Sequence, residues 1–322
     1  MGRGRGAGHV PAPLRGTAER RDADRTDARK ATHHLSIFIA SIAFGLVTSA
    51  VLALASVGFT LQFAVTNVLN LAYGAVMIAS AFIAYAVNQA GVNVWIAAVV
   101  AALTGAVFSL FLNNVVYTPF QRRGTSPIAM VIVALGMTLI LEFGTQAIAG
   151  GTNVSFTMGQ GPTFQAGSFQ LTGVQLAIII LSVVSMLGIH VLIRFTRLGK
   201  AMRATAANRN LARNCGIRTD RVVTLTWLIT GALCGLAGAV FAMDAGTFGA
   251  TSTDLFLVLI LAAVFLGGPG EPYGAMLGAL VIGLATEVSA AFIVPDYKDV
   301  IAFVILLAML AVRPTGLLGA RT

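Results

Sequence analysis

Charged side chains are scarce in this sequence. Only 10% of the 322 residues are Asp, Glu, Lys or Arg, and none of them occurs between Ala31 and Gln121. A soluble domain of this size does not leave so long a stretch without charge, because its surface must face water. Hydrophobic residues make up 57% of the chain. The composition therefore predicts an all-α, polytopic membrane protein.

The residues from which catalytic and metal sites are built are also few. The two cysteines, Cys215 and Cys234, stand in a basic loop and in an apolar run, which predicts neither a disulfide nor a metal site. The four histidines form no pattern with acids or cysteines. Gly199-Lys200 lacks the upstream glycine of a P-loop, and Gly268-Pro269-Gly270 follows no strand. We expect no catalytic residue, no metal and no bound cofactor in this chain.

Basic residues gather in one loop. The segment 194–221 carries eight Lys or Arg residues and a single acid, Asp220, between the apolar runs 174–193 and 222–243. Each run is long enough to cross a hydrocarbon core of about 30 Å. Because Lys and Arg in short loops stay in the cytoplasm, this loop and the second basic loop at 121–124 are predicted to lie there. The stretch 200–214 predicts a surface helix that ends at Gly216 and rests on lipid headgroups or on a soluble partner.

The remaining apolar runs predict eight to ten membrane spans between residues 35 and 318. Residues 1–34 mix Gly, Pro, Arg and acids and are predicted to form a disordered basic tail, and residues 319–322 a short second tail. The net charge of +9 sits mainly in the tail and the basic loop, which favours lipid headgroups over nucleic acid as partner. The charge of the first tail favours the cytoplasm, whereas counting nine spans back from the loops puts it outside. The uncharged segment 150–173 is predicted to lie on the face opposite the basic loops.

Two non-helical breaks interrupt the apolar runs at matching places. Asn67 and Asn70 precede Tyr73-Gly74-Ala75, and the break 267–272 precedes Tyr273-Gly274-Ala275. Interrupted helices at equivalent places in two halves indicate a translocation site near the membrane midplane. Broken backbone inside a membrane is tolerated only where protein or a cavity supports it.

Three blocks of the sequence resemble the permease subunits of bacterial branched-chain amino acid ABC importers, in particular the H-type subunit. The blocks are Gly58-Phe59-Thr60-Leu61 through Asn70-Leu71-Ala72-Tyr73-Gly74; Thr196 to Ala204 continuing to Gly216-Ile217 and Asp220-Arg221-Val222; and Leu266-Gly267-Gly268 with Gly274-Ala275, Tyr297-Lys298-Asp299 and Arg313 to Leu317. They span most of the chain after residue 45, without the first tail. The sequence departs from the family where Tyr73 replaces a His and Ala75 an acid, and the acid expected after Gly283 appears as Glu287.

The resemblance implies a type II-like, all-helical permease in the bacterial inner membrane that forms half of a translocation pore. It also implies a sister permease, two cytoplasmic ATPases that use ATP and Mg²⁺, and an extracytoplasmic solute-binding protein. The ATPase-docking residues that it suggests in the coupling loop 194–221 are Gly199, Arg203, Ala206, Ala207, Ala212, Gly216, Ile217 and Asp220. The candidate pathway residues at the two breaks are Asn67, Asn70, Tyr73, Gly74, Gly267, Gly268 and Gly270.

The function expected from the resemblance is import of branched-chain, hydrophobic amino acids by alternating access. Related permeases carry urea or short amides, and the changes at Tyr73 and Ala75 leave the substrate open, as they leave open whether the pore pairs this chain with a sister or with itself. The alternative from another class is a self-sufficient secondary transporter or channel. In that case Glu142 and Glu287, which stand alone in apolar runs, would couple an ion; otherwise they serve helix packing.

Overall fold

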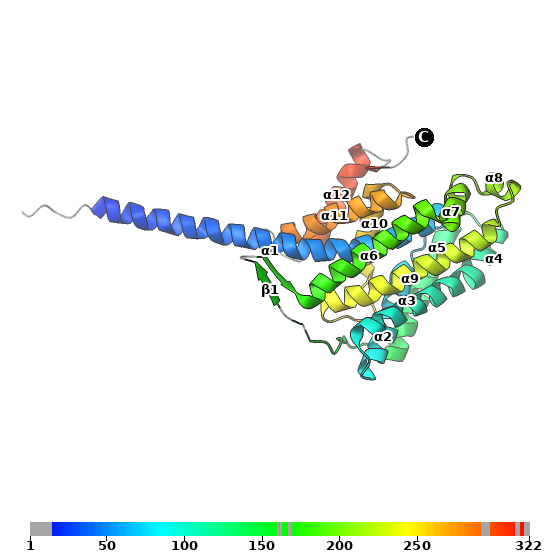
Figure 1. Cartoon of the computed structure of the whole chain (residues 1–322), viewed down its shortest axis with the longest axis horizontal. Helices are drawn as coiled ribbons and strands as arrows, with labels where there is room; N and C mark the ends of the chain where they lie inside the picture. The colour runs from blue at the N-terminus through cyan, green and yellow to red at the C-terminus, as the bar shows by residue number, and fades with distance from the viewer. Residues whose placement is uncertain are drawn as a thin grey trace, which may run out of the picture.

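The described part of the chain is a bundle of helices with one small antiparallel pair of strands (Figure 1). The computed structural model describes residues 15–159, 161, 163–166, 169–290, 297–312 and 316–318. The elements are α1 (Arg15–Thr66), α2 (Tyr73–Gln89), α3 (Val94–Phe111), the π-helix η1 (Leu112–Tyr117), α4 (Thr118–Arg122), α5 (Pro127–Ala149), β1 (Thr163–Ala166), β2 (Phe169–Thr172), α6 (Gly173–Phe195), α7 (Arg197–Ala207), α8 (Arg209–Asn214), α9 (Thr219–Ala245), α10 (Asp254–Gly267), α11 (Pro272–Ala290) and α12 (Lys298–Val312). The two strands pair antiparallel, with Thr163 opposite Thr172.

Six helices of the described part are long and apolar enough to cross a membrane. They are Phe38–Thr66, Val94–Arg122, Pro127–Ala149, Gly173–Phe195, Thr219–Ala245 and Pro272–Ala290. The predicted all-helical, polytopic membrane fold is confirmed. Eight to ten spans were expected, and three of the expected spans correspond to α2, α10 and α12, which are 17, 14 and 15 residues long. α2 and α10 are short because the two breaks divide the apolar runs.

Small residues bring the central helices into close contact. Gly105 of α3 lies against Gly235 of α9, where an added Cβ would collide with the backbone of Ala101. α1 and α11 pack in the same way, with Gly283 lying against Ser49. Helices in lipid depend on such close van der Waals packing, because lipid tails are as apolar as the side chains. α9 is buried along most of its length and contacts α1, α2, α3, α6 and α7, so it forms the centre of the bundle.

The bundle has two chemically different ends. We call the end with α7, α8 and the loop 121–125 the basic end, and the end with β1 and β2 the hairpin end (Figure 1). α9 runs from the basic end to the hairpin end, and α3 runs antiparallel to it, since Ala101 faces Gly235 and Ser109 faces Gly231. The two basic loops therefore lie together at one end and the hairpin lies at the other, which agrees with the charge pattern.

α1 begins at Arg15, inside the segment 1–34 for which the sequence predicts disorder. No Pro or Gly occurs between residues 17 and 44, and this stretch continues a helix already nucleated in the membrane, so it avoids the cost of starting a new one. A prediction of disorder from composition treats this segment as an isolated peptide, whereas in the structure it is the continuation of a membrane helix. Residues 1–14, Arg313 and the second tail, 319–322, lie outside the described residues.

The direction of α1 is set by its packing. Gly45 lies against Leu284 and Ser49 against Gly283, so α1 runs antiparallel to α11. Its N-terminal half consequently projects from the hairpin end, opposite α7 and α8 (Figure 1). The charge of the tail favoured the same side as the basic loops, whereas helix packing places it at the other end.

Candidate functional site

The two predicted breaks lie side by side. The first separates α1 from α2 and the second separates α10 from α11. Asn67 adopts a left-handed conformation with φ of 53°, and Gly268 and Gly270 have φ of 111° and 90°. A Cβ placed on Gly270 would lie 3.9 Å from the Cβ of Ala64, in the last turn of α1. The fold thus joins two segments that are far apart in the sequence.

Side chains of the first break are mostly buried in packing contacts. The Tyr117 hydroxyl donates a hydrogen bond to Oδ1 of Asn70 at 2.7 Å. The Tyr73 hydroxyl donates to the backbone oxygen of Ala55 at 3.1 Å. Asn70 and Tyr73 are only 2% and 1% exposed. Asn67, by contrast, is exposed, so it is the polar side chain of this break that lies at the surface.

The start of α2 is tied to α9 and α10. The Cys234 thiol of α9 donates to the backbone oxygen of Tyr73 at 3.2 Å, and the Thr253 hydroxyl donates to that of Gly74 at 3.0 Å. A Cβ on Gly74 would lie 3.3 Å from the Cβ of Leu257 in α10. Gly74 therefore permits close packing of α2 on α10.

The second break is closed by backbone packing. Gly267 lies against Gly274 across the turn, and neither has room for a Cβ. Two successive amides of the segment 316–318 donate to the carbonyls of Leu266 and Gly267 at 2.8 and 2.9 Å. These bonds satisfy carbonyls at the end of α10 that have no partner within the helix. Gly267 and Gly268 are buried, whereas Gly270 is half-buried.

Gln62 is a residue that the sequence pattern did not single out. It is 1% exposed, and both its side-chain oxygen and its nitrogen are buried without a hydrogen-bond partner. It follows Gly58 by one turn, and Gly58 packs on α9, so Gln62 falls on the side of α1 that faces α9. The hydroxyls of Ser56 and Thr60 on the same helix are also buried and unpartnered. Such groups are rare in native proteins and indicate a water, a ligand or a second conformation.

The loop 194–221 forms two helices, where the sequence predicted a single surface helix. α7 ends at Ala207, and the side chain of Asn208 then caps α8 by accepting from the Leu211 amide at 2.9 Å. Asn favours such a cap over a helix interior, which explains the interruption. Thr196 caps α7 in the same manner, accepting from the Gly199 amide at 3.0 Å.

α7 has one buried and one exposed side. Its residues that pack against the bundle are Gly199, Met202 and Thr205. The helix contacts α1, α6 and α9. The suggested docking residues on its exposed side are Arg203, Ala206 and Ala207. Ala212 of α8 is buried, whereas the neighbouring Leu211, which the sequence reading did not include, is 60% exposed.

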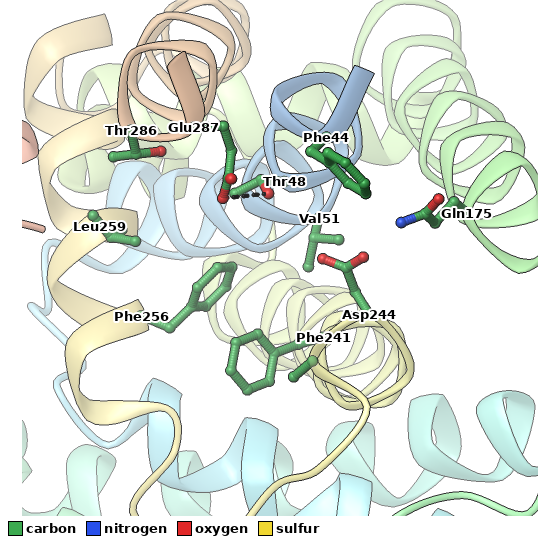
Figure 2. Close-up of a pocket in the computed structure, with 11 residues that line it drawn as sticks. Phe44, Thr48, Val51, Gln175, Phe241, Asp244, Phe256, Leu259, Thr286 and Glu287 are labelled. Atoms are coloured by element: carbon green, nitrogen blue, oxygen red, sulfur yellow. Dashed lines mark hydrogen bonds between the residues drawn. The ribbon is translucent and has the colours of Figure 1, made fainter. Parts of the chain in front are cut away.

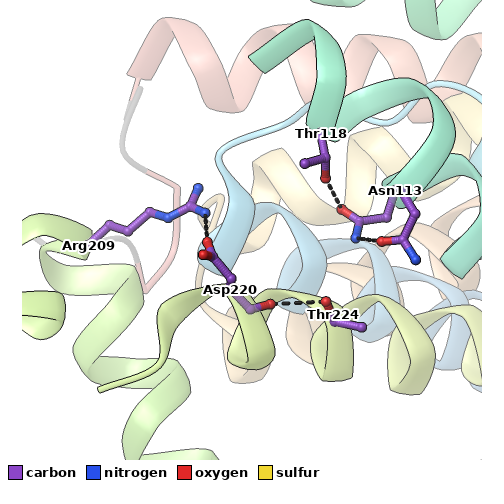
Figure 3. A network of polar contacts seen from close by, with 6 residues as sticks. Asn113, Thr118, Arg209, Asp220 and Thr224 are labelled. Carbon is purple, nitrogen blue, oxygen red and sulfur yellow. Dashed lines mark hydrogen bonds and ion pairs between the residues drawn. The ribbon is translucent and has the colours of Figure 1, made fainter. Parts of the chain in front are cut away.

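An exposed salt bridge spans the turn from α8 to α9. Nη2 of Arg209 lies 3.1 Å from Oδ1 of Asp220, and Figure 3 shows the two side chains joined across the turn. Gly216 has φ of 83°, and the Ile217 amide donates to the Ala212 carbonyl at 3.0 Å, a Schellman-type bond that ends α8. Gly216, Ile217 and Asp220 therefore shape the turn, and Gly216 ends the helical segment as expected.

The two acids of the apolar runs have different neighbours. Glu142 of α5 is buried, and its carboxyl group lies against that of Asp254 at the start of α10. Glu287 of α11 accepts a hydrogen bond from the Thr48 hydroxyl at 3.2 Å. Within the described ranges, no group of three His, Cys, Asp or Glu side chains is placed to hold a metal ion.

Comparisons with known proteins agree with this architecture. The family model described as branched-chain amino acid transport system, permease component, matches residues 41–310. The chain is 28% identical over 299 residues to the high-affinity branched-chain amino acid transport system permease protein LivH of Escherichia coli, a match that covers 88% of this chain and 96% of that protein. It is 27% identical over 296 residues to the corresponding permease BraD of Pseudomonas aeruginosa, with coverage of 88% and 96%.

A permease for another solute also matches. The galactofuranose transporter permease protein YtfT of Escherichia coli is 28% identical over 273 residues, which cover 82% of this chain and 77% of that protein. No solved structure matches the chain. Permeases of this kind are transport subunits that work with ATPase and solute-binding partners, and the reading as a self-sufficient transporter or channel is not favoured. The chain belongs to the branched-chain amino acid transport permeases, the multi-pass membrane subunits of ATP-binding cassette importers.

Proposed function

We propose that this chain is one permease of a bacterial inner-membrane importer for branched-chain amino acids. The names of its relatives and their nearly complete coverage support the substrate class. A sister permease completes the pore, and two cytoplasmic ATPases consume ATP with Mg²⁺. A solute-binding protein delivers the amino acid at the hairpin end. The basic end faces the cytoplasm, because both basic loops gather there.

The main structural support for this proposal is that α7 has one buried side and one exposed side. One side packs on α1, α6 and α9, and the other presents Arg203, Ala206 and Ala207 to the cytoplasm. The small side chains of the two alanines let a groove on a partner close around the helix. An ATPase that binds the exposed side of α7 moves the whole helix. Because the buried side of α7 packs on α1, this motion acts on the end of α1 where the first break begins.

The pathway runs past the two breaks. Asn67 offers an exposed amide there, and Gly270 brings the second break against the end of α1. Irregular backbone rearranges more readily than a continuous helix, since fewer hydrogen bonds hold it. In this proposal the exposed parts of the two breaks move, while the buried contacts of Asn70 and Tyr73 hold the first break in place and the close packing of Gly267 and Gly268 holds the second.

Docking is tested by placing a bulky residue on the exposed side of α7. Ala207→Trp should abolish recovery of the ATPases with the tagged chain, purified in mild detergent from its native membrane and quantified by mass spectrometry. Ala90→Trp, at an exposed position at the hairpin end, is the matched control and should retain them. Both variants must elute as a single species. Equal recovery of ATPases with Ala207→Trp and with the unchanged chain would contradict the docking assignment.

The substrate is tested with the whole importer in proteoliposomes. Uptake of leucine, isoleucine and valine should depend on ATP and on the solute-binding protein, and urea and galactofuranose should not compete. Solute movement by this chain alone, without ATPases, would contradict the proposal.

A further inference from the structure

A basic pocket lies at the basic end, where α9 begins its membrane span. It has a volume of about 450 Å³ and is formed by the turn that joins α8 to α9. Three of its lining residues are arginines with exposed side chains, namely Arg213, Arg218 and Arg221. The other described lining residues are Gly216, Ile217, Thr219 and Asp220. The exposed side of α7, where ATPase docking is proposed, does not line this pocket.

The positive charge of the pocket is not balanced by acids of the described residues. Asp220 is the one acid among the described lining residues, and its carboxylate is paired with Arg209 at 3.1 Å (Figure 3). Among the residues that the structure describes, no carboxylate lies within salt-bridge distance of the three lining arginines. Guanidinium groups present planar pairs of donors that match the oxygens of a phosphate. The pocket therefore favours a ligand with a phosphate group.

An apolar stripe continues from this pocket into the membrane span. Most of α9 is buried, yet Leu225 and Leu228 are 43% and 41% exposed. They follow Arg221 at helical spacing, so the three side chains lie on one face of α9. At a rise of 1.5 Å per residue, the leucines lie about 6 and about 10 Å beyond Arg221 along the helix.

These distances agree with the layers of a bilayer. The headgroup layer on each side of the hydrocarbon core is about 5–7 Å thick. When Arg221 lies among the headgroups, Leu225 and Leu228 therefore lie beside the upper parts of the acyl chains. The same face of α9 thus offers a charged partner for a lipid headgroup and an apolar partner for its chain.

This combination distinguishes a lipid from other ligands with a phosphate. A free phosphate would contact the arginines but leave the leucines unused. A zwitterionic lipid also carries an ammonium group, which the arginines repel, whereas the headgroup of phosphatidylglycerol carries only the negative charge. An ATPase cannot account for the exposed leucines, because they lie within the membrane span.

We propose that the turn between α8 and α9 binds an anionic phospholipid. Its phosphate lies among Arg213, Arg218 and Arg221, and one acyl chain lies along Leu225 and Leu228. The inference goes beyond the proposed import function and does not depend on which solute is carried. Because α7 leads through α8 into this turn, the bound lipid holds the end of the coupling loop at the membrane surface.

The test measures lipid binding to the full chain, purified in mild detergent and depleted of lipid, by native mass spectrometry. The unchanged chain should bind phosphatidylglycerol more tightly than phosphatidylcholine. Arg218→Gln combined with Arg221→Gln should weaken binding of phosphatidylglycerol about tenfold or more, since each arginine near the surface contributes to the attraction. Arg122→Gln combined with Arg123→Gln is the matched control. It removes the same charge from exposed residues at the same end that do not line the pocket, and binding should stay unchanged.

A second pair of measurements separates a lipid from a free anion. Leu225→Ala combined with Leu228→Ala should also weaken binding of phosphatidylglycerol, and a large excess of inorganic phosphate should not displace the lipid more than chloride of equal ionic strength does. Displacement by phosphate alone would show a site for a free anion and overturn the lipid assignment. Equal affinity of the unchanged chain for the two lipids, or equal binding of phosphatidylglycerol by the two arginine double variants, would overturn the proposal.

Discussion

Replacing Gln62 with Met should make the chain more stable but lower its transport activity. The Gln62 side chain is 1% exposed and carries two buried polar atoms without partners. An unsatisfied buried polar group costs about 1–3 kcal/mol, and a thioether of similar length removes that cost while filling the same volume. We therefore expect Gln62→Met to raise the free energy of unfolding by about 1–3 kcal/mol. Transport should fall, because a polar group kept in an apolar interface at the expense of stability is typical of a functional position.

The measurement pairs thermal unfolding of the purified chain in detergent with leucine uptake by the reconstituted importer. Gln89→Met, at an exposed site at the end of α2, serves as the control for the chemical change and should alter neither quantity. A variant at position 62 that is less stable than the unchanged chain would refute the reasoning, since it would mean that the amide already has a partner, such as a buried water.

Other predictions follow from the packing and from the two ends. Gly235→Val should destabilise the fold by about 1–3 kcal/mol or more in thermal unfolding, because its side chain meets the backbone of α3, while Gly136→Val, in open space, should not. Asp220→Asn should change the unfolding free energy by less than about 1 kcal/mol, since its salt bridge is exposed, and a larger loss would contradict this. A membrane-impermeant maleimide should label Cys215 in inside-out vesicles but not in intact cells, and should leave buried Cys234 unlabelled in both preparations. Labelling of Cys215 in intact cells would show that the basic end faces outward and would contradict the proposed orientation.

Features that depend only on residues close together in the sequence were predictable. The break at Asn67 to Asn70 follows from polar residues between apolar runs, although α2 begins only at Tyr73. The end of α8 follows from Gly216, because glycine adopts a φ of 83° more readily than other residues. The gathering of the basic loops at one end follows from charge. The interruption between α7 and α8 also has a local signal in Asn208, because Asn is a common helix cap whose side chain accepts from an amide three residues later.

Features that depend on which residues meet in space were not predictable. Asn70 and Tyr73 read as polar pathway residues, yet their burial depends on Tyr117 and on the carbonyl of Ala55, and a linear pattern does not show such pairings. A cavity at the hairpin end is lined by Asp244 of α9, Glu287 of α11 and Thr48 of α1 (Figure 2). Each of these residues alone reads as an ordinary helix-end or span residue.

α1 connects the proposed parts of the mechanism. Its first membrane half lines the cavity through Thr48 and Val51, its second half holds Gln62, and its end forms the break at Asn67. α7 contacts this helix at the basic end, where the ATPases are proposed to bind. α1 packs tightly on α11 at Ser49, so its two ends cannot move independently without bending or breaking the helix. A displacement of α7 should therefore alter the break first and reach the hairpin end through the same rigid helix, which links ATP use at the basic end to solute uptake at the hairpin end.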